Sequence, residues 1–235
     1  MGRIQNIRKE EKDYHDYCYD NYKLFQSGSW LHKPVQTVME LLPLLADKEE
    51  VKILDLGAGV GRNAIPIAEW IRDSNRKGKV ICIDFLESAI NRLTSYCKEF
   101  HVSQYIEPIQ SSIEDFNIME EDYDLVVAVS SLEHVESEEH LRLVLNEIER
   151  GTKTGGIVCL IINSEIEEMD CESGENLEVH IEVNLQTEEM NQVLLDTFSR
   201  WTVLKKLVKP LEYKITRGHR EVLLKTNAIT YVAKK

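Results

Sequence analysis

Residues 51–63 read VKILDLGAGVGRN, and no other run in the chain restricts the fold as strongly. The first half of this run is apolar, as in a buried parallel strand, and the second half has glycine at alternate positions. Apolar residues at helical spacing follow: Ala64, Ile65, Ile67, Ala68 and Ile71. The predicted order is strand, tight turn and helix. Glycine permits positive φ and close approach to the backbone, and a helix start has free N–H groups, so we expect a nucleotide-like ligand here.

The spacing of the glycines restricts the ligand further. A dinucleotide fingerprint, G-x-G-x-x-G, would need glycine at position 62, where the chain has Arg62. The observed pattern is G-x-G-x-G, with Asp55 two residues before it. The next apolar strand, residues 79–84, ends in Asp84, 27 positions after Gly57, where a carboxylate can accept both hydroxyls of a ribose. Two signals linked by spacing favour a ribose-containing cofactor.

Strand and helix alternate through the middle of the chain. The expected elements are helix 3–24, helix 35–45, strand 51–56, helix 62–73, strand 79–84, helix 86–99, strand 105–109, strand 123–129, helix 138–150, strand 156–162, helix 187–198, strand 201–208 and strand 228–233. This alternation is typical of a doubly wound α/β sheet with three layers and right-handed crossovers. The length suits one domain, so we expect residues 1–235 to form a single domain.

Composition and the N-terminal sequence exclude several classes of protein. No apolar run approaches the ~20 residues that span a bilayer, and the first residues lack the apolar stretch of a signal peptide, so we expect a cytoplasmic protein without a membrane partner. The five cysteines form no C-x-x-C pair, and two of them, Cys82 and Cys159, fall inside predicted core strands. We therefore expect reduced structural thiols and no metal site.

Charge is distributed unevenly in the last third of the chain. The net charge of −13 disfavours a nucleic acid as the main ligand. Residues 163–199 contain 11 acidic residues and no Lys or Arg, whereas residues 200–235 contain 10 basic and two acidic residues, a change from −11 to +8. One interpretation is that these are solvated faces that pair with each other, and the other is a basic rim around an anionic substrate.

The glycine run and the strand that ends in Asp84 resemble the class I S-adenosylmethionine-dependent methyltransferases over residues 51–162. The run Gly61-Arg62-Asn63-Ala64 is most similar to the tellurite-resistance type of small-molecule methyltransferase. The resemblance implies a Rossmann-like sheet of seven strands whose last strand is antiparallel. It also implies an N-terminal helical cap (1–48), a cofactor-binding core (49–162), and an acidic insertion with a C-terminal strand pair (163–235).

The resemblance assigns the loop after the first strand to the methionine part of S-adenosylmethionine. The backbone of Gly57, Ala58 and Gly59 is expected to approach the aminocarboxypropyl group. Asp55 is expected to orient the turn or a water near the ammonium. The alternative is an ordinary turn without a ligand.

The loops after the second and third strands are expected to hold the adenosine. Asp84 is the predicted ribose acceptor, and Phe85 is placed to stack on adenine. Asp84 could instead cap the helix that follows, since Asp is a preferred N-cap residue. Ser112 stands where the family commonly has Asp, so the backbone of Ile113 is expected to take part in adenine recognition.

Residues near the transferred methyl group are expected after the fourth strand and before the last one. The segment Ser130 to Val135 resembles the family segment under the methionine, so Ser130 is a predicted cofactor contact. His134 is a predicted catalytic residue, as a base or by positioning substrate, although hydrogen bonding at the start of a helix is an equally good role for it. His219 and Arg220 resemble a His-Arg pair that faces an oxyanion substrate, with solvated loop charges as the alternative.

The predicted function is methyl transfer from S-adenosylmethionine to a small-molecule acceptor, with an anionic acceptor as the sharper hypothesis. Methyl transfer from a sulfonium is an in-line displacement that depends mostly on alignment and desolvation. Three alternatives stay open: an RNA-modifying methyltransferase, a protein that binds S-adenosylmethionine without catalysis, and a nicotinamide-dependent oxidoreductase.

Overall fold

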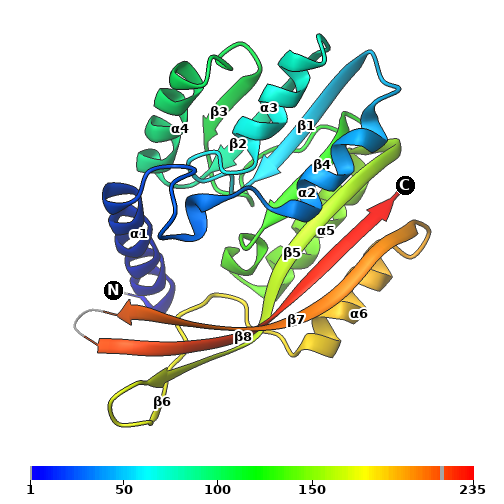
Figure 1. Cartoon of the computed structure of the whole chain (residues 1–235). Coiled ribbons are helices and arrows are strands. Elements are labelled where there is room, and N and C mark those ends of the chain that lie inside the picture. Colours follow the sequence, from blue (N-terminus) through cyan, green and yellow to red (C-terminus); the bar gives the residue numbers. More distant parts are fainter. Residues whose placement is uncertain (1, 218–219) are drawn as a thin grey trace.

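A computed structural model describes residues 2–217 and 220–235 of the chain (Figure 1). Helix α1 (Arg3–Asn21) and a short stretch with η1 (Trp30–His32), α2 (Gln36–Leu41) and η2 (Leu42–Leu45) precede the first strand. Helix α1 lies within the helix expected at 3–24. The helix expected at 35–45 is instead divided into α2 and η2, because Pro43 favours a 3₁₀ turn at this point. None of the helices in the described part of the chain combines the length and apolar character of a bilayer span.

The sheet has the predicted methyltransferase topology. Its parallel part contains β1 (Glu50–Leu56), β2 (Lys77–Asp84), β3 (Ile106–Gln110) and β4 (Tyr123–Val129), followed by β5 (Thr152–Asp170), β7 (Thr202–Arg217) and β8 (Arg220–Lys234). The strand order is β3-β2-β1-β4-β5-β8-β7, and β8 runs antiparallel between β5 and β7. The predicted Rossmann-like fold of seven strands with an antiparallel last strand is confirmed, and a two-residue strand, β6 (Asn176–Leu177), pairs with β5 outside this path.

Helices cover both faces of the sheet and create two apolar cores. Helices α3 (Ala64–Asp73) and α4 (Glu87–Glu99) lie on one face with the N-terminal helices, and α5 (Glu138–Gly151) and α6 (Thr187–Thr197) lie on the other. Because side chains alternate along a strand, Ile53 belongs to the first core and Leu54 to the second. Asp55 follows on the first face, at the carboxyl end of β1.

The largest departure from the sequence predictions is a twisted ribbon that projects beyond the sheet (Figure 1). It consists of the outer parts of β5, β7 and β8, residues 163–170, 209–217 and 220–227, and we call it the ribbon. The expectation of an acidic insertion from residue 163 and of a loop before the last strand was wrong here. These residues are mostly polar, and a bulge between Ser164 and Glu167, with Glu165 at φ 48°, interrupts the alternation that marks a strand.

Strand β7 is one of the two edge strands of the sheet, and it exposes several apolar side chains. The exposed ones on its first half are Val203, Leu204, Leu207 and Val208. Lysines 205, 206 and 209 and Pro210 interleave with them. Lys and Pro on an edge strand oppose pairing with another strand, so this edge is protected against aggregation.

Candidate active site

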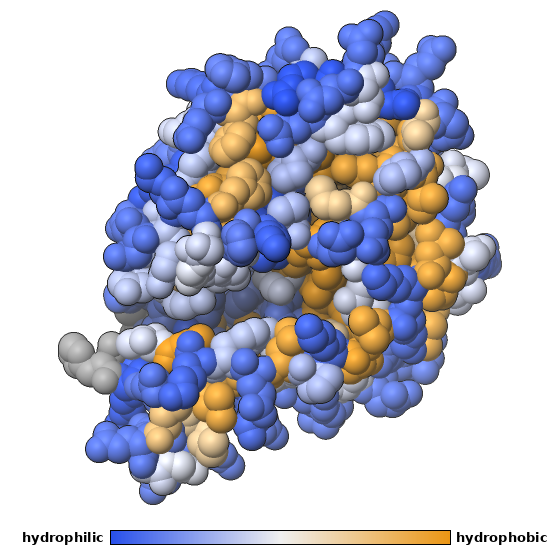
Figure 2. Space-filling model, viewed as in Figure 1, coloured by the Kyte–Doolittle hydropathy of each residue, from blue (hydrophilic) through white to orange (hydrophobic). Residues whose placement is uncertain are grey.

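The predicted site residues gather at the carboxyl ends of the parallel strands. Figure 1 shows α1 and the ribbon on this side of the sheet, where the strands β1 and β2 end. Figure 2 shows a furrow between the ribbon and the rest of the molecule, with apolar side chains along part of its walls. Ligands of open α/β sheets bind at such strand ends, so this is the candidate active site.

The turn after β1, residues 57–61, has three glycines with positive φ, and they serve different purposes. The φ angles of Gly57, Gly59 and Gly61 are 74°, 54° and 94°. A Cβ atom on Gly57 would collide with the side chain of Ser131, and one on Gly61 would lie 2.6 Å from a methyl carbon of Leu93. A Cβ atom on Gly59 would meet one atom within 4 Å, the hydroxyl oxygen of Tyr19 at 3.2 Å. Close packing therefore explains two of the glycines, whereas at Gly59 a Cβ atom would meet only the hydroxyl of Tyr19.

Hydrogen bonds within the protein occupy the first three N–H groups of this turn. The N–H groups of Gly57 and Ala58 both donate to the carbonyl oxygen of Ile83, at 2.8 and 2.9 Å. The structure thus brings both residues to the site but commits their N–H groups to β2. The N–H of Gly59 donates to Oδ2 of Asp84 at 2.7 Å.

Asp84 connects the two loops that the cofactor is expected to touch. Besides the bond from Gly59, its Oδ1 accepts the N–H of Leu86 at 2.9 Å. Helix α4 begins at Glu87 with Leu86 as its N-cap residue, so Asp84 is not the N-cap that the alternative interpretation proposed. Burial raises the pKa of Asp84, while the two backbone hydrogen bonds and the nearby His15 and His134 lower it. Each carboxylate oxygen keeps a second lone pair for a hydroxyl donor.

Asp55 is a buried carboxylate with an unsatisfied oxygen. Its side chain is almost completely buried, and its Oδ2 has no hydrogen-bond partner among the described residues. Burial raises the pKa of Asp55 to about 7, against the opposing effect of Arg62. An unpartnered buried oxygen is costly, and a cationic or hydrogen-bond-donating ligand would satisfy it. Together with the missing side chain at Gly59, it fits the amino group of the predicted cofactor.

The predicted adenine residues lie on the loops after β2 and β3. Phe85 is half exposed, and the guanidinium carbon of Arg8 lies 5.4 Å from its ring centroid. Ser112 is engaged within its own turn, because its hydroxyl donates to Oδ2 of Asp115 at 2.6 Å and accepts the Asp115 N–H at 3.1 Å. Ile113 is half-buried and lines a hollow of ≈ 290 Å³ between its loop and α5.

The loop after β4 is strained at Ser130. This exposed residue has φ 50°, a left-handed conformation uncommon for serine, and its N–H donates to the carbonyl oxygen of Ile161 at 2.8 Å. The neighbouring Ser131 is buried and donates to the carbonyl oxygen of Leu56 at 2.7 Å. These bonds hold the end of β4 between β1 and β5.

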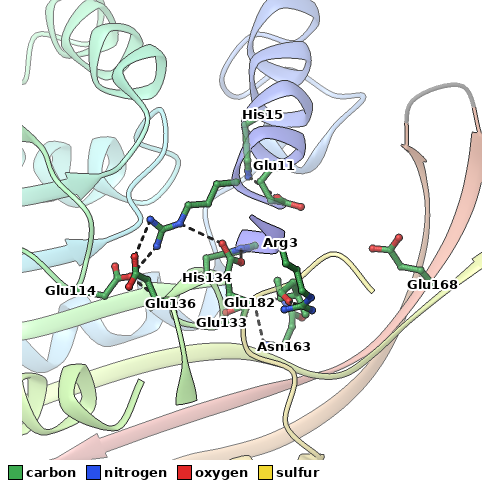
Figure 3. A network of polar contacts seen from close by, with 12 residues as sticks. Arg3, Glu11, His15, Glu114, Glu133, His134, Glu136, Asn163, Glu168 and Glu182 are labelled. Atoms are coloured by element: carbon green, nitrogen blue, oxygen red, sulfur yellow. Dashed lines mark hydrogen bonds and ion pairs between the residues drawn. The ribbon is translucent and has the colours of Figure 1, made fainter. Parts of the chain in front are cut away.

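His134 ends the 3₁₀ helix η3 (Leu132–His134) and lies in a network of carboxylates (Figure 3). Its Nδ1 is 3.1 Å from Oε2 of Glu182, whose side chain is 1% exposed. Burial alone would lower the pKa of His134, but the hydrogen bond to Glu182 and the charges of Glu11 and Glu133 outweigh it and raise the pKa to about 9. His134 is therefore an imidazolium near neutral pH.

Helix α1 is attached to this network by Arg8. Its guanidinium lies 3.1 Å from a carboxylate oxygen of Glu114, 3.6 Å from Glu136 and 3.7 Å from Glu182. These three acids belong to the loops after β3, η3 and β6. One arginine of α1 therefore joins three loops of the core.

Two arginines of the C-terminal basic region, Arg217 and Arg220, are paired with acids. Arg217 lies 3.1 Å from Glu11 and 2.9 Å from Glu168, and Arg220 lies 4.0 Å from Asp170. These contacts agree with faces that pair with each other rather than with a free basic rim. His219 lies outside the described residues.

Sequence reasoning missed Glu11, His15 and Glu182. With Arg8 and Tyr19, the first two follow one stripe of α1 at spacings of three and four, a signal that was present in the sequence. Glu182 had no such signal, because it is one of 11 acidic residues in a stretch without periodicity. Among the described residues, no group of three or more His, Cys, Asp or Glu is arranged to hold a metal ion.

Comparisons with known proteins agree with this geometry. Residues 53–156 match a family model described as a methyltransferase domain. TehB from Haemophilus influenzae has a similar structure, with a TM-score of 0.63 and 18% identity over 94% of this chain and 67% of that protein. A SAM-dependent methyltransferase from Methanosarcina mazei gives a TM-score of 0.58 and 18% identity over 86% of this chain and 98% of that one. A sequence comparison with curated proteins finds no match.

The chain therefore contains a methyltransferase domain. The predicted methyltransferase family is thus confirmed over residues 53–156, and the similar structures confirm the predicted Rossmann-like fold.

Proposed function

We propose that the protein transfers a methyl group from S-adenosylmethionine to a small-molecule acceptor that binds in the furrow beside the ribbon. The observation that carries this proposal is the meeting of Asp55, Gly59 and Asp84 at one edge of a methyltransferase domain. An unsatisfied buried carboxylate oxygen, a glycine without a side chain in the turn and a second carboxylate complement an amino group and a ribose.

The cofactor supplies an electrophilic methyl group on a sulfonium. The chain's own residues have to bind and orient it: Asp55 and the turn at Gly59 on the methionine side, and Asp84, Phe85, Ser112 and Ile113 on the adenosine side. Ser130 adds a contact beneath the methionine. Because an in-line displacement depends on alignment, the protein needs no strong base.

A small acceptor is supported by how closely the site is covered. Tyr19 of α1 is buried over the turn at Gly59, and it stacks edge to face with Trp30. Arg8 holds the same helix to three loops of the core. A folded RNA would need an open, basic approach, and Arg217 is instead held between Glu11 and Glu168.

The finer predictions belong to this proposal. His134 and Arg220 are proposed to face the acceptor, and an anionic acceptor is the preferred class. The role predicted for His219 stays a prediction, since this residue lies outside the described ones. A place in the cytoplasm stays a prediction as well.

The experiment is a binding titration followed by a transfer assay on the full chain. We expect S-adenosylhomocysteine to bind at micromolar concentrations and NADH not to bind, and the reverse preference would favour an oxidoreductase. Radiolabelled S-adenosylmethionine is then offered with small anionic, neutral and cationic acceptors and with bulk RNA. Transfer to RNA alone would favour the RNA-modifying alternative, and binding without transfer to any acceptor would favour a sensor.

A further inference from the structure

A buried contact connects the segment after β6 to the end of β4. Glu182 accepts a hydrogen bond from Nδ1 of His134 at 3.1 Å. The backbone makes a second connection, because the N–H of Val183 donates to the carbonyl oxygen of Glu133 at 3.0 Å. Both connections restrict the imidazole ring, and Figure 3 shows Glu182 and His134 side by side beneath α1. The acidic stretch of the sequence thus delivers one specific carboxylate to the candidate active site.

The orientation of the ring leaves its other nitrogen for a ligand. Within residues 2–217 and 220–235, His134 makes one side-chain hydrogen bond, through Nδ1. About a third of the side chain is exposed, at 30%, whereas Glu182 is 1% exposed. The Nδ1 edge is therefore held against the protein and the ring still reaches solvent. A histidine fixed in this way through one nitrogen presents the other for chemistry.

Carboxylates dominate the surroundings of this ring. Glu11 and His15 face it from α1, Asp84 from the end of β2, Glu133 from η3, and Glu182 from the segment after β6. Burial lowers the pKa of His15, against the opposing charges of Glu11 and Asp84. Arg8 lies on the far side of Glu182, at 3.7 Å, and offsets part of the negative charge.

The charge of Glu133 also raises the pKa of His134. Its side chain is almost fully buried, and its Oε1 accepts a hydrogen bond from Nδ2 of Asn163 at 2.6 Å. Its Oε2 has no partner among the described residues. The carboxylate is thus fixed in place next to the imidazole, where a positive charge on the ring compensates it.

We propose that Glu182 is a positioning residue that holds His134 as an imidazolium, whose Nε2–H donates a hydrogen bond to an oxygen of the methyl acceptor. This inference rests on the proposed function and names the acceptor class: a molecule that carries an ionised oxygen and arrives without a proton to lose. The acceptor's lone pair forms the new bond to the methyl carbon, the sulfur keeps the electrons of the broken bond, and no proton has to leave. His134 then orients the acceptor and does not act as a base.

The first test is an NMR titration of the full chain with isotope-labelled histidine, in which His134→Asn identifies the signal of His134. We expect the His134 signal in the native protein to titrate well above the ordinary histidine range. Glu182→Gln should lower its midpoint by at least about one pH unit, because it removes the adjacent charge. Glu178→Gln is the matched control, since Glu178 belongs to the same segment and its side chain is 75% exposed. An ordinary midpoint in the native protein and in both variants would overturn the proposal.

Glu182→Asp keeps the test decisive if Glu182→Gln does not fold. Aspartate retains the charge on a shorter side chain, so the midpoint should stay above that of free histidine. An unraised midpoint in a folded Glu182→Asp protein would show that the carboxylate does not hold the proton.

The second test uses acetate and methylammonium as probes on protein saturated with S-adenosylhomocysteine. We expect acetate to shift the Nε2 signal of His134 in a saturable manner, and the Glu182→Gln protein to need several times more acetate. A saturable shift with methylammonium and none with acetate would contradict the acceptor class. Binding of S-adenosylhomocysteine is measured separately. If it does not bind, that result counts against the proposed function, and the histidine titration still tests the role of Glu182.

Discussion

The hydroxyl oxygen of Tyr19 lies 3.2 Å from the position that a Cβ atom on Gly59 would take. The N-terminal helix thus lies directly over Gly59, the glycine of the turn at the candidate site. Burial raises the pKa of Tyr19 well above its usual value, so the hydroxyl stays protonated and can donate a hydrogen bond. A ligand on this turn would have α1 as its cover, so we expect residues of α1 to take part in binding.

Gly59→Val should abolish binding of S-adenosylhomocysteine. The new side chain fills the space between the turn and Tyr19, and we expect a loss of at least about 100-fold in affinity, close to 3 kcal/mol. Valine at positive φ also costs roughly 1–3 kcal/mol of folding stability. Gly155→Val is the matched control, because Gly155 has φ 79° and nothing within 4 Å of its Cβ position. Calorimetry should show normal binding to the control, and normal binding to Gly59→Val would exclude this turn as the cradle of the cofactor.

Arg8→Ala should make the bound cofactor product leave faster. Arg8 joins α1 to three loops of the core, and its loss loosens the cover over the site. We expect the dissociation rate of S-adenosylhomocysteine, measured by stopped-flow displacement, to rise about three- to tenfold. Lys9→Ala is the control, because Lys9 pairs with Asp13 of the same helix. Equal dissociation rates in both variants would show that the attachment of α1 by Arg8 does not control release of the ligand.

The central part of the fold was predictable because its signals are local. An apolar run, alternate glycines and a strand that ends in Asp84 determine β1, the turn and β2 within about 35 residues. The same signals placed Asp55, Gly59 and Asp84 at one edge of the sheet. They did not show that Gly57 and Gly61 are required by packing against Ser131 and Leu93, since those contacts come from distant parts of the chain.

The ribbon and the role of the acidic stretch could not be predicted for a different reason. Strands that are exposed on both faces carry no apolar alternation, so residues 209–217 resemble a charged loop in the sequence. The contact of Glu182 with His134 depends on where the segment after β6 returns to the core, and the two residues are 48 positions apart in the sequence. Tertiary structure alone selects this one carboxylate.

Asp84→Ala should weaken S-adenosylhomocysteine by about 2–3 kcal/mol, as for the loss of charge-assisted hydrogen bonds to two hydroxyls. The substitution also removes the acceptor of the Gly59 and Leu86 N–H groups, so it loosens both loops. Asp84→Asn keeps one acceptor oxygen and should lose less affinity than Asp84→Ala. Calorimetric titration of both variants gives the order, and an unchanged affinity in Asp84→Ala would remove this residue from the site.

Asp55 should make the folded protein less stable as the pH rises through its raised pKa of about 7. Below this pH the folded state keeps a proton that the unfolded state releases near the ordinary pKa of 3.8. Stability therefore falls by about 1.4 kcal/mol for each pH unit between these two values. Asp55→Asn should flatten this slope in urea unfolding experiments, and an identical slope in both proteins would show that Asp55 is not the titrating group.

Arg220→Ala should reduce turnover of anionic acceptors far more than cofactor affinity. Arg220 is highly exposed and its nearest carboxylate, Asp170, is 4.0 Å away, so its removal should change the free energy of unfolding by less than about 0.5 kcal/mol. If the guanidinium aligns an acceptor, kcat/KM for an anionic acceptor should fall about tenfold or more, while that for an uncharged acceptor changes little. Lys225→Ala provides the comparison, because Lys225 lies on the same strand and pairs with Glu212 at 3.7 Å. If Arg220→Ala and Lys225→Ala are equally active on every acceptor, Arg220 belongs to the solvated edge of the ribbon, and the anionic acceptor must then be recognised by other groups.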